Sequence, residues 1–196
     1  NRDVIEGQGT IALEILAQTP RFDAIVVPVG GGGLIAGIGT VIKARAPDVE
    51  GIGVEPERAA CLAAALAHGG PTTVSLAPTL ADGLAVSRLG ALPYAIVRRV
   101  VDRAITVDEA SIALAIVRLV ELENGVGEGA GAAALAAFLS GKLDDLRGKD
   151  VVLVLCGGNI DSTMLGRVIE VGLVTDGRLC RFTVSISDRP GGLARL

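Results

Sequence analysis

The sequence has almost no aromatic residues, and this limits what the protein can bind. It contains no tryptophan, one tyrosine and three phenylalanines, and its 18 lysines and arginines do not outnumber its 22 aspartates and glutamates. Nucleic-acid-binding proteins normally carry a basic patch and side chains on which bases can stack. The sequence therefore argues against a nucleic-acid partner.

Histidine and cysteine are also scarce. The only histidine is His68, and the three cysteines, Cys61, Cys156 and Cys180, form no CxxC pair. An odd number of cysteines without metal-like spacing argues against a disulfide framework and against a zinc site. Free thiols of this kind are typical of a reducing compartment, so we expect a cytoplasmic protein.

Long uncharged runs are rare, and one of nearly membrane-span length has a better explanation than a membrane span. Residues 24–42 carry no charge but include Pro28 and four consecutive glycines, Gly30 to Gly33. A buried strand, a glycine loop and a helix explain this run better than a lipid-facing helix. We therefore expect no membrane association.

Strands alternate with helices along the chain. The predicted strands are 24–29, 51–55, 103–107 and 151–156. The predicted helices are 9–18, 34–45, 56–68, 94–100, 108–123, 128–140 and a last one that ends near residue 171. This alternation predicts an α/β fold with an open, mostly parallel sheet and helices on both faces. Ligands bind such sheets at the carboxyl ends of the strands.

The pattern changes after Gly172. Polar and apolar residues alternate from Leu179 to Ser187, which predicts a strand with one solvated face, followed by a turn at 188–192. We therefore expect one domain at 1–174 and the start of a second, α+β unit at 175–196. Because one such strand is not stable alone, we expect that unit to be completed beyond Leu196.

The glycine loop, Gly30 to Gly33, is a candidate anion site. Glycines let a backbone approach a ligand closely, and the free amides at a helix N-terminus attract phosphate. The loop does not identify the phosphate by itself. Together with Ala36 it also fits the dinucleotide fingerprint GxGxxG/A, and Glu55 lies about where a ribose-binding acid would be. A dinucleotide-binding oxidoreductase domain is therefore an alternative.

Six motifs occur in order along the chain: GQGTIALEI, PVGGGGLIAG, VEPE, ADGLAV, GEGAGAAA and LCGGNID. With these motifs the chain resembles the threonine ammonia-lyase and serine racemase family of fold-type II enzymes, which use pyridoxal 5'-phosphate (PLP). The resemblance covers residues 4–171 and implies the C-terminal portion of a catalytic domain. The tail resembles the start of an ACT-like regulatory domain.

The resemblance implies a role for several residues. The backbone amides that would bind the PLP phosphate belong to Gly30, Gly31, Gly32, Gly33 and Leu34. Gly83 and Glu128 would lie near the cofactor ring, and Cys156 stands where the family has Ser, Thr or Cys beside the pyridine nitrogen. Without a cofactor, Cys156 would be a small core residue and Glu128 a helix N-terminal charge.

Glu55 and Ala59 resemble part of a cation site found in serine racemase relatives, which would hold a divalent or monovalent cation. The third ligand in those relatives is an aspartate, whereas Cys61 stands at that place in this chain. A thiol is a poor ligand for a hard cation. The resemblance thus implies a cation site that lacks one of its ligands.

The activity that the resemblance implies is deamination of L-threonine or L-serine by β-elimination of water, as in isoleucine biosynthesis. The products are 2-oxobutanoate or pyruvate, together with ammonia. A thiol at Cys156 would not keep the pyridine nitrogen protonated, which suits elimination better than transamination. None of the three lysines, Lys43, Lys142 and Lys149, is placed to reach the cofactor. We therefore expect the imine-forming lysine upstream and assign no catalytic residue to this chain.

The expected partners follow from the same resemblance. They are a small amino-acid substrate, an amino-acid effector of the tail, and further copies of the chain in a homo-oligomer. A third hypothesis is a non-catalytic, amino-acid-sensing fragment whose lyase part has degenerated. The presence or absence of the upstream lysine separates this hypothesis from the lyase.

Overall fold

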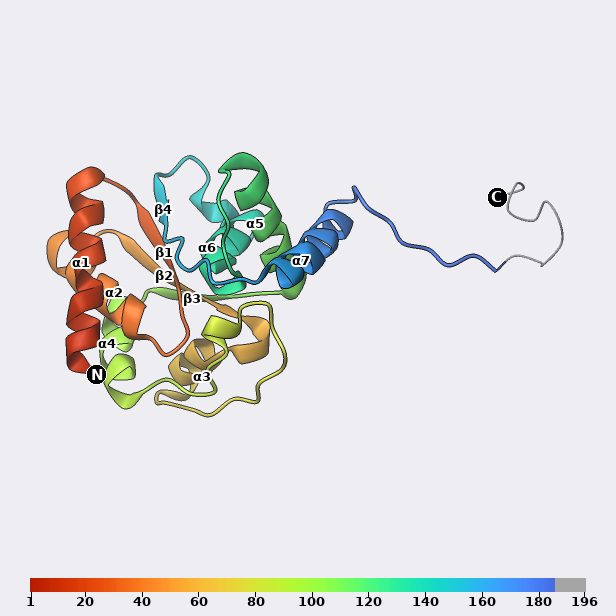
Figure 1. The fold of residues 1–196 in the computed structure, drawn as a ribbon. Helices are drawn as coiled ribbons and strands as arrows, with labels where there is room; N and C mark the ends of the chain where they lie inside the picture. The colour runs from red at the N-terminus through yellow and green to blue at the C-terminus, as the bar shows by residue number, and fades with distance from the viewer. Residues whose placement is uncertain (186–196) are drawn as a thin grey trace, which may run out of the picture.

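The computed structural model describes residues 1–185 and places four strands of this part of the chain in one sheet (Figure 1). The strands are β1 (Ala24–Pro28), β2 (Glu50–Pro56), β3 (Arg103–Val107) and β4 (Val151–Leu153). Their order is β3-β2-β1-β4, and every neighbouring pair is parallel. The predicted parallel α/β sheet is therefore confirmed.

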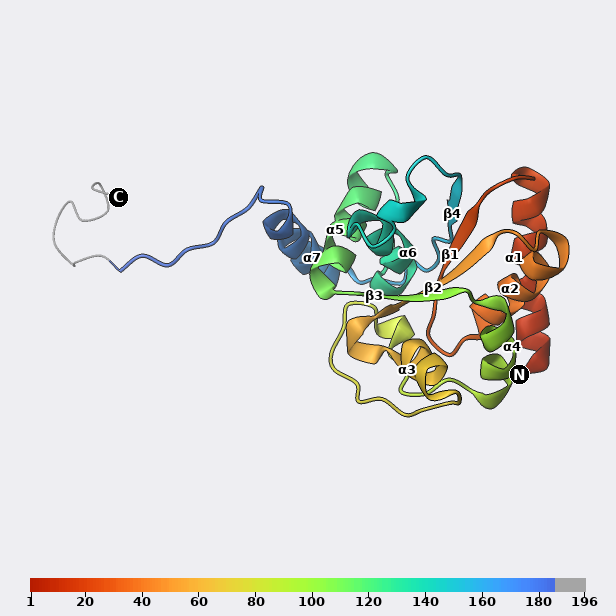
Figure 2. The same cartoon turned by 180° about the vertical axis from the view of Figure 1, so that it is seen from behind.

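Helices cover both faces of this sheet, as Figures 1 and 2 show from opposite sides. The described helices are α1 (Arg2–Gln18), α2 (Gly33–Arg45), α3 (Cys61–His68), α4 (Ala91–Val100), α5 (Glu109–Leu122), α6 (Gly129–Leu139) and α7 (Ser162–Thr175). Three short 3-10 turns are η1 (Glu57–Ala59), η2 (Asp82–Leu84) and η3 (Asp144–Leu146). No helix within residues 1–185 has the length and hydrophobicity required to cross a membrane.

Strand β1 shows how one sequence run contributes to two cores. All five of its residues are buried. Ala24 and Val26 pack into the cluster under α5 and α6, whereas Ile25 and Val27 pack into the cluster under α1 and α2. Successive side chains of a strand point to opposite faces, so a strand covered on both sides must be apolar throughout.

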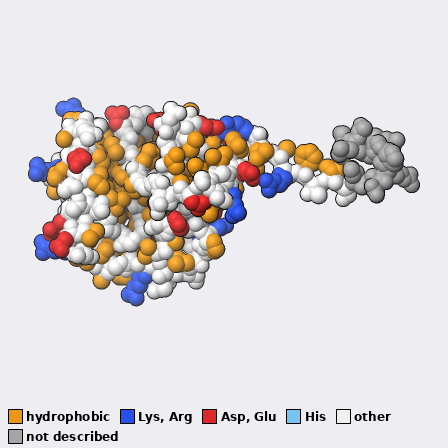
Figure 3. Space-filling model, in the orientation of Figure 1, with side chains coloured by type: hydrophobic (Ala, Val, Ile, Leu, Met, Phe, Trp, Pro, Cys, Tyr) orange, Lys and Arg blue, Asp and Glu red, His pale blue; other side chains and the backbone are white. Residues whose placement is uncertain are grey.

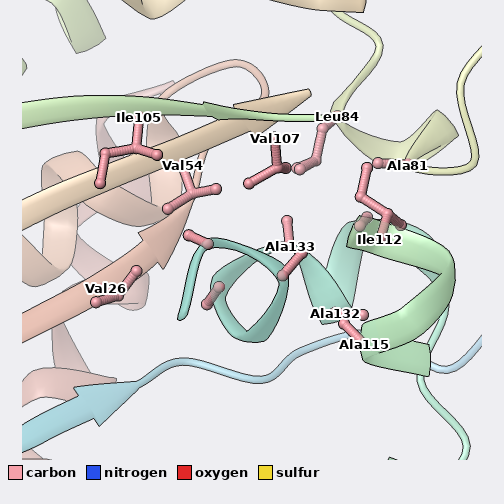
Figure 4. Packing of buried hydrophobic residues seen from close by; sticks show 14 of the residues in the cluster. Val26, Val54, Ala81, Leu84, Ile105, Val107, Ile112, Ala115, Ala132 and Ala133 are labelled. Atoms are coloured by element: carbon pink, nitrogen blue, oxygen red, sulfur yellow. The ribbon is translucent and has the colours of Figure 1, made fainter. Parts of the chain in front are cut away.

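Helix α6 packs close to the sheet because its residues are small. Ala132 and Ala133 are fully buried and belong to the same core cluster as Val26 and Val54 of the strands; in Figure 4 Ala133 lies on the side of α6 toward the strands, and Ala132 lies beside Ala115 of α5. Larger side chains at these positions would hold the helix axis farther away. The predicted small-residue helix is confirmed, and its closeness to the sheet brings the start of α6 to the strand ends.

Strand β4 is shorter than predicted. The apolar run 151–156 predicts a buried strand, but regular pairing ends at Leu153, and Leu155 is 48% exposed. Among the described residues β4 pairs only with β1, at the edge of the sheet. Val154 still donates to Val26, after which the chain leaves the ladder and turns at Gly157.

The predicted strand from Leu179 is not formed over residues 179–185. This segment extends away from the body of the molecule in Figures 1 and 2. Its apolar side chains, including Phe182 at 75% exposure, line the extension in Figure 3. A strand needs a partner for its backbone groups, and no part of residues 1–185 pairs with it. The turn predicted at 188–192 lies outside the described residues.

Candidate cofactor site

After the neighbouring strands β1 and β4, the chain continues to opposite faces of the sheet. After β1 the chain enters α2, which packs in one core cluster, and after β4 it enters α7, whose Val168 lies in the other. The two connecting loops diverge, which leaves a crevice at the carboxyl ends of β1 and β4. Open α/β sheets bind their ligands at such a point.

A cavity of about 270 Å³ occupies this crevice. The eight residues that the sequence assigns to the cofactor all line it, namely Gly30, Gly31, Gly32, Gly33, Leu34, Gly83, Glu128 and Cys156. The volume is near the lower end of the range of ligand pockets, about 300–1,000 Å³. A larger hollow of about 680 Å³, lined by residues 138–149, contains none of these residues. We regard the smaller cavity as the site because residues from four distant segments converge there.

The glycines of the loop are not equivalent. Gly32 has a φ of 81°, and a Cβ placed there would lie 2.4 Å from Cδ2 of Leu89. A Cβ on Gly31 or Gly33 would meet nothing within 4 Å, and both residues line the cavity. Gly32 therefore makes the turn, whereas Gly31 and Gly33 leave the backbone open toward the cavity.

The loop also presents free hydrogen-bond donors. Within the described part of the chain no protein acceptor is found for the amides of residues 30–34, and the first helical bond runs from Ala36 to the Gly32 carbonyl. Helix α2 is 13 residues long and has no acidic residue in its first turn. Its N-terminus therefore favours an anion without competition from a side chain. This arrangement fits the phosphate of PLP.

Glu128 and Cys156 form the other wall of the cavity. The Glu128 carboxylate accepts a hydrogen bond from the Asn159 amide at 2.9 Å, and the Glu128 amide donates to the Gly157 carbonyl at 3.2 Å. Glu128 thus holds the turn after β4 in place, a role that the sequence analysis missed. Glu128 is half-buried and is the N-cap residue of α6, although its side chain makes no capping hydrogen bond.

Cys156 is an exposed residue that faces the cavity. Partial desolvation raises the pKa of its thiol, and the neighbouring Glu128 carboxylate raises this pKa further. The thiol is therefore protonated at neutral pH and offers a weak hydrogen bond rather than a charge. This chemistry fits a pyridine nitrogen that is not kept protonated.

Two glycines of α6 explain the GEGAGAAA motif. A Cβ on Gly131 would lie 1.8 Å from the Cys156 carbonyl oxygen, and one on Gly129 would lie 2.0 Å from the Leu80 carbonyl oxygen. The first turn of α6 is therefore in contact with the backbone of two segments near the cavity, one at Leu80 and one at Cys156. Any side chain at Gly129 or Gly131 would push these segments away.

Gly83 comes from the long irregular segment between α3 and α4. The segment is anchored by Glu109, whose carboxylate accepts the Leu80 amide at 2.6 Å. Arg58 adds a second anchor, because it donates to the Pro78 carbonyl and accepts from the Ala77 amide. Neither residue is predictable from the sequence, since nothing local shows that Arg58 and Glu109 fix a loop far along the chain.

The lysines lie away from the cavity. Lys43 donates to the Val49 carbonyl at 2.9 Å and pairs with Asp102 at 2.7 Å. Lys142 pairs with Glu57 at 3.2 Å, and Lys149 borders the hollow at residues 138–149. No lysine is among the residues that line the cavity.

Glu55 does not have the role that a dinucleotide site requires. It is fully buried, and its carboxylate accepts the amides of Leu62 at 2.7 Å and Ala63 at 2.8 Å. Burial raises the pKa of Glu55 to about 7, although the two amides act in the opposite direction. A ribose hydroxyl could not reach this carboxylate, so the dinucleotide alternative loses its acidic residue.

The surroundings of Glu55 do not fit a cation either. Both carboxylate oxygens already accept amides at the N-terminus of α3, where the helix dipole favours negative charge. Burial raises the pKa of the Cys61 thiol to about 11, so this group is neutral. Among residues 1–185 no three His, Cys, Asp or Glu side chains gather into a possible metal site. The sequence predicted that this helix begins at Pro56, but α3 begins at Cys61. The hydrogen bonds from the Leu62 and Ala63 amides to Glu55 explain the difference.

Comparison with known proteins shows which family the chain resembles. The family model described as pyridoxal-phosphate dependent enzyme matches residues 1–157. The L-threonine ammonia-lyase of Thermotoga maritima is 47% identical over 193 residues, which cover 98% of this chain and 48% of that protein.

Solved structures with the same fold are also related in sequence. A processed threonine deaminase isoform 2 from Solanum lycopersicum is 36% identical with a TM-score of 0.81, covering 85% of this chain and 49% of that one. Maize serine racemase is 36% identical with a TM-score of 0.78, covering 83% of this chain and 52% of that one.

These similarities favour PLP over a dinucleotide, the two cofactors with which the glycine loop is compatible. The chain spans about half the length of the curated relatives that it matches. Over that half, the family match and the convergence of the predicted residues on one cavity agree. The chain therefore belongs to the family of pyridoxal-phosphate dependent enzymes, with the fold of type II.

Proposed function

We propose that the intact protein is a PLP-dependent ammonia-lyase that converts L-threonine to 2-oxobutanoate and ammonia, and L-serine to pyruvate and ammonia. One observation carries the proposal. Eight predicted cofactor residues line one cavity in a chain 47% identical to an L-threonine ammonia-lyase. The reaction is the β-elimination of water from the amino acid.

When bound, PLP supplies an electron sink that stabilises the charge left after loss of the α-proton. The residues of this chain would hold and orient it. The amides of residues 30–34 and the N-terminus of α2 bind the phosphate anion. Cys156 would offer the ring nitrogen a neutral thiol, and Glu128, which is hydrogen-bonded to the turn after Cys156, would keep that turn against the cavity.

The proton-transferring groups lie elsewhere in this proposal. Because no lysine lines the cavity, the imine-forming lysine comes from the half of the enzyme that the chain does not span. Residues 1–174 would then be the C-terminal portion of the catalytic domain. A protein whose remaining half lacks this lysine would instead be the non-catalytic amino-acid sensor.

The test is an assay of the purified intact protein. We expect a visible absorption band of protein-bound PLP, and 2-oxobutanoate with equimolar ammonia from L-threonine. The ratio of kcat/KM for L-threonine and L-serine defines the preferred substrate. Formation of D-serine without a keto acid would identify a racemase, and the absence of both the band and the products would refute the proposal.

Replacement of Cys156 tests its contact with the ring nitrogen. Cys156→Ser keeps a neutral hydrogen-bonding group, so PLP content and elimination should largely survive. Cys156→Asp places a carboxylate there, which should raise the pKa of the ring nitrogen by about 1–3 units and lower kcat about tenfold or more. Absorption spectra of both variants across pH check this. Identical spectra and rates for Ser and Asp would show that Cys156 does not touch the ring.

We also propose a cytoplasmic homo-oligomer whose residues from 175 onward begin a regulatory unit that binds an amino-acid effector. The exposed apolar side chains of Leu179, Phe182 and Val184 support the need for a partner surface. Deletion of everything after Val174 from the intact enzyme should keep basal activity and abolish the response to isoleucine or valine. An unchanged effector response after the deletion would place regulation elsewhere.

A further inference from the structure

Glu55 is the one charged residue that is fully buried in the part of the chain that the structure describes. It lies at the carboxyl end of β2, where Val54 is in register with Pro28 of β1. The glycine loop starts two residues after Pro28. A buried carboxylate is costly unless its oxygens are hydrogen-bonded, so its partners show what it does.

Its partners are the first free amides of α3. The residue before that helix is Ala60, which has no side-chain acceptor for them. The Glu55 carboxylate accepts from Leu62 and Ala63 instead, at 2.7 and 2.8 Å. Without Glu55, the buried Leu62 amide and the half-buried Ala63 amide would both lose their hydrogen-bond acceptor.

The first residue of α3 then reaches the glycine loop. The thiol of Cys61 is fully buried and donates to the carbonyl oxygen of Gly30, with an Sγ to O distance of 3.6 Å. Three hydrogen bonds, two to the Glu55 carboxylate and one from the neighbouring Cys61 thiol, therefore connect Glu55 to the first peptide of the phosphate loop. We call this set of groups the strut. It consists of the Glu55 carboxylate, the amides of Leu62 and Ala63, the Cys61 thiol and the Gly30 carbonyl.

The strut controls the direction of a phosphate-binding donor. The carbonyl of Gly30 and the amide of Gly31 belong to one planar trans peptide, in which C=O and N–H point in opposite directions. When Cys61 holds the carbonyl toward α3, the Gly31 amide must point away from α3. Between two glycines a peptide can rotate at little steric cost, so the orientation needs an external contact.

We propose that Glu55 and Cys61 are positioning residues that orient the Gly30–Gly31 peptide for the PLP phosphate, and that protein atoms alone do this, without a cation. The proposal rests on the proposed PLP site. It assigns to the strut the place where the resemblance to serine racemases implied a cation. The two amides that the carboxylate oxygens already accept and the positive end of α3 both disfavour a cation there.

The test compares PLP with pyridoxal, which lacks the phosphate, in the intact protein after removal of its cofactor. Cys61→Ala should weaken PLP binding about two- to fivefold, the lower part of the range for one hydrogen bond, because a thiol is a weak donor. Pyridoxal affinity should stay unchanged, because pyridoxal does not use the loop. Cys61→Ser keeps a donor and should recover part of the loss. Inorganic phosphate, titrated alone, should follow PLP.

Val49→Ala is the matched control, because Val49 is buried in the same core cluster as Cys61 but precedes β2 at the opposite end of the sheet. It should lower stability like Cys61→Ala and leave the ratio of PLP to pyridoxal affinity unchanged. Glu55→Gln replaces one acceptor oxygen by an NH2 donor and leaves one α3 amide without an acceptor, so we expect a larger loss together with a destabilised fold. The Cys61 variants therefore carry the test.

The outcomes separate the strut from the proposed function. Equal PLP affinity in Cys61→Ala and the wild type, or an equal loss for pyridoxal, would overturn the strut. Loss of PLP affinity on treatment with EDTA, restored by Mg²⁺ or Ca²⁺, would overturn its independence from a cation. A wild type that binds no PLP refutes the proposed function, and the phosphate titrations then still decide whether Cys61 orients the loop.

Discussion

An aspartate in place of Gly33 is expected to leave the fold intact and to abolish PLP retention. Gly33 is the first residue of α2, its φ is not positive, and a Cβ there meets nothing within 4 Å. A negative charge at a helix N-terminus stabilises the helix by about 0.3–1 kcal/mol. The same charge about 4 Å from a phosphate repels it by about 4 kcal/mol at an effective dielectric constant of about 20, roughly a 1,000-fold loss of affinity.

The matched control is Gly33→Asn, which has the same shape without the charge. We expect Gly33→Asn to lose much less affinity than Gly33→Asp, because only the steric part of the effect remains. PLP content after dialysis and thermal unfolding of the cofactor-free proteins are the two measurements. If Gly33→Asp retained PLP as well as Gly33→Asn does, the anion would not lie at this end of α2.

The sequence predicts where the phosphate loop lies but not how its glycines differ. The strand–glycine–helix order identifies Gly30 to Gly33 as an anion site because helix N-termini and close backbone approach are local properties. Which glycine takes a positive φ depends on packing. Leu89 and Pro93, from the far side of an irregular segment, come within 3.1 Å of the Cβ position of Gly32. Nothing within the loop itself reveals this contact.

The role of Glu55 was also not predictable from the sequence alone. Its position after a strand suggests a ligand-binding acid, whether for a ribose or for a cation. The structure buries it completely and uses it to begin α3. Deciding between these roles requires the distance from the end of β2 to the start of α3. That distance follows from how α3 packs on the sheet, through Leu62 over Gly53, and not from spacing in the sequence.

Strand predictions succeeded for β2 and for the edge strand β3, but β4, at the other edge, is shorter than predicted and the segment 179–185 does not pair. β2 and β3 follow their apolar runs, and β3 has the predicted bounds. β4 stops after three residues, and residues 179–185 form no strand. Alternation and β-branched residues indicate that a segment can pair, but hydrogen bonding to a neighbour decides whether it does.

Opposite effects are expected from the same substitution at two helical glycines. Gly131→Ala in α6 and Gly166→Ala in α7 both replace a helical glycine, which by itself favours the helix by up to about 1 kcal/mol. Around Gly166 a Cβ meets nothing within 4 Å, so this variant should be stabilised. At Gly131 the Cβ would lie 1.8 Å from the Cys156 carbonyl oxygen, a backbone atom that cannot rotate away.

The clash at Gly131 should dominate because overpacking of a close contact costs about 1–3 kcal/mol or more, which exceeds the gain in helix propensity. The Cys156–Gly157 turn must move away from α6, and this shifts one wall of the cavity away from the glycine loop. We expect Gly131→Ala to lower the melting temperature of the intact protein and to lose most of its PLP, whereas Gly166→Ala raises the melting temperature and keeps its PLP. Thermal unfolding and cofactor content of both variants measure this contrast. A Gly131→Ala protein with normal PLP content would show that the contact between α6 and the Cys156 turn does not shape the cofactor site.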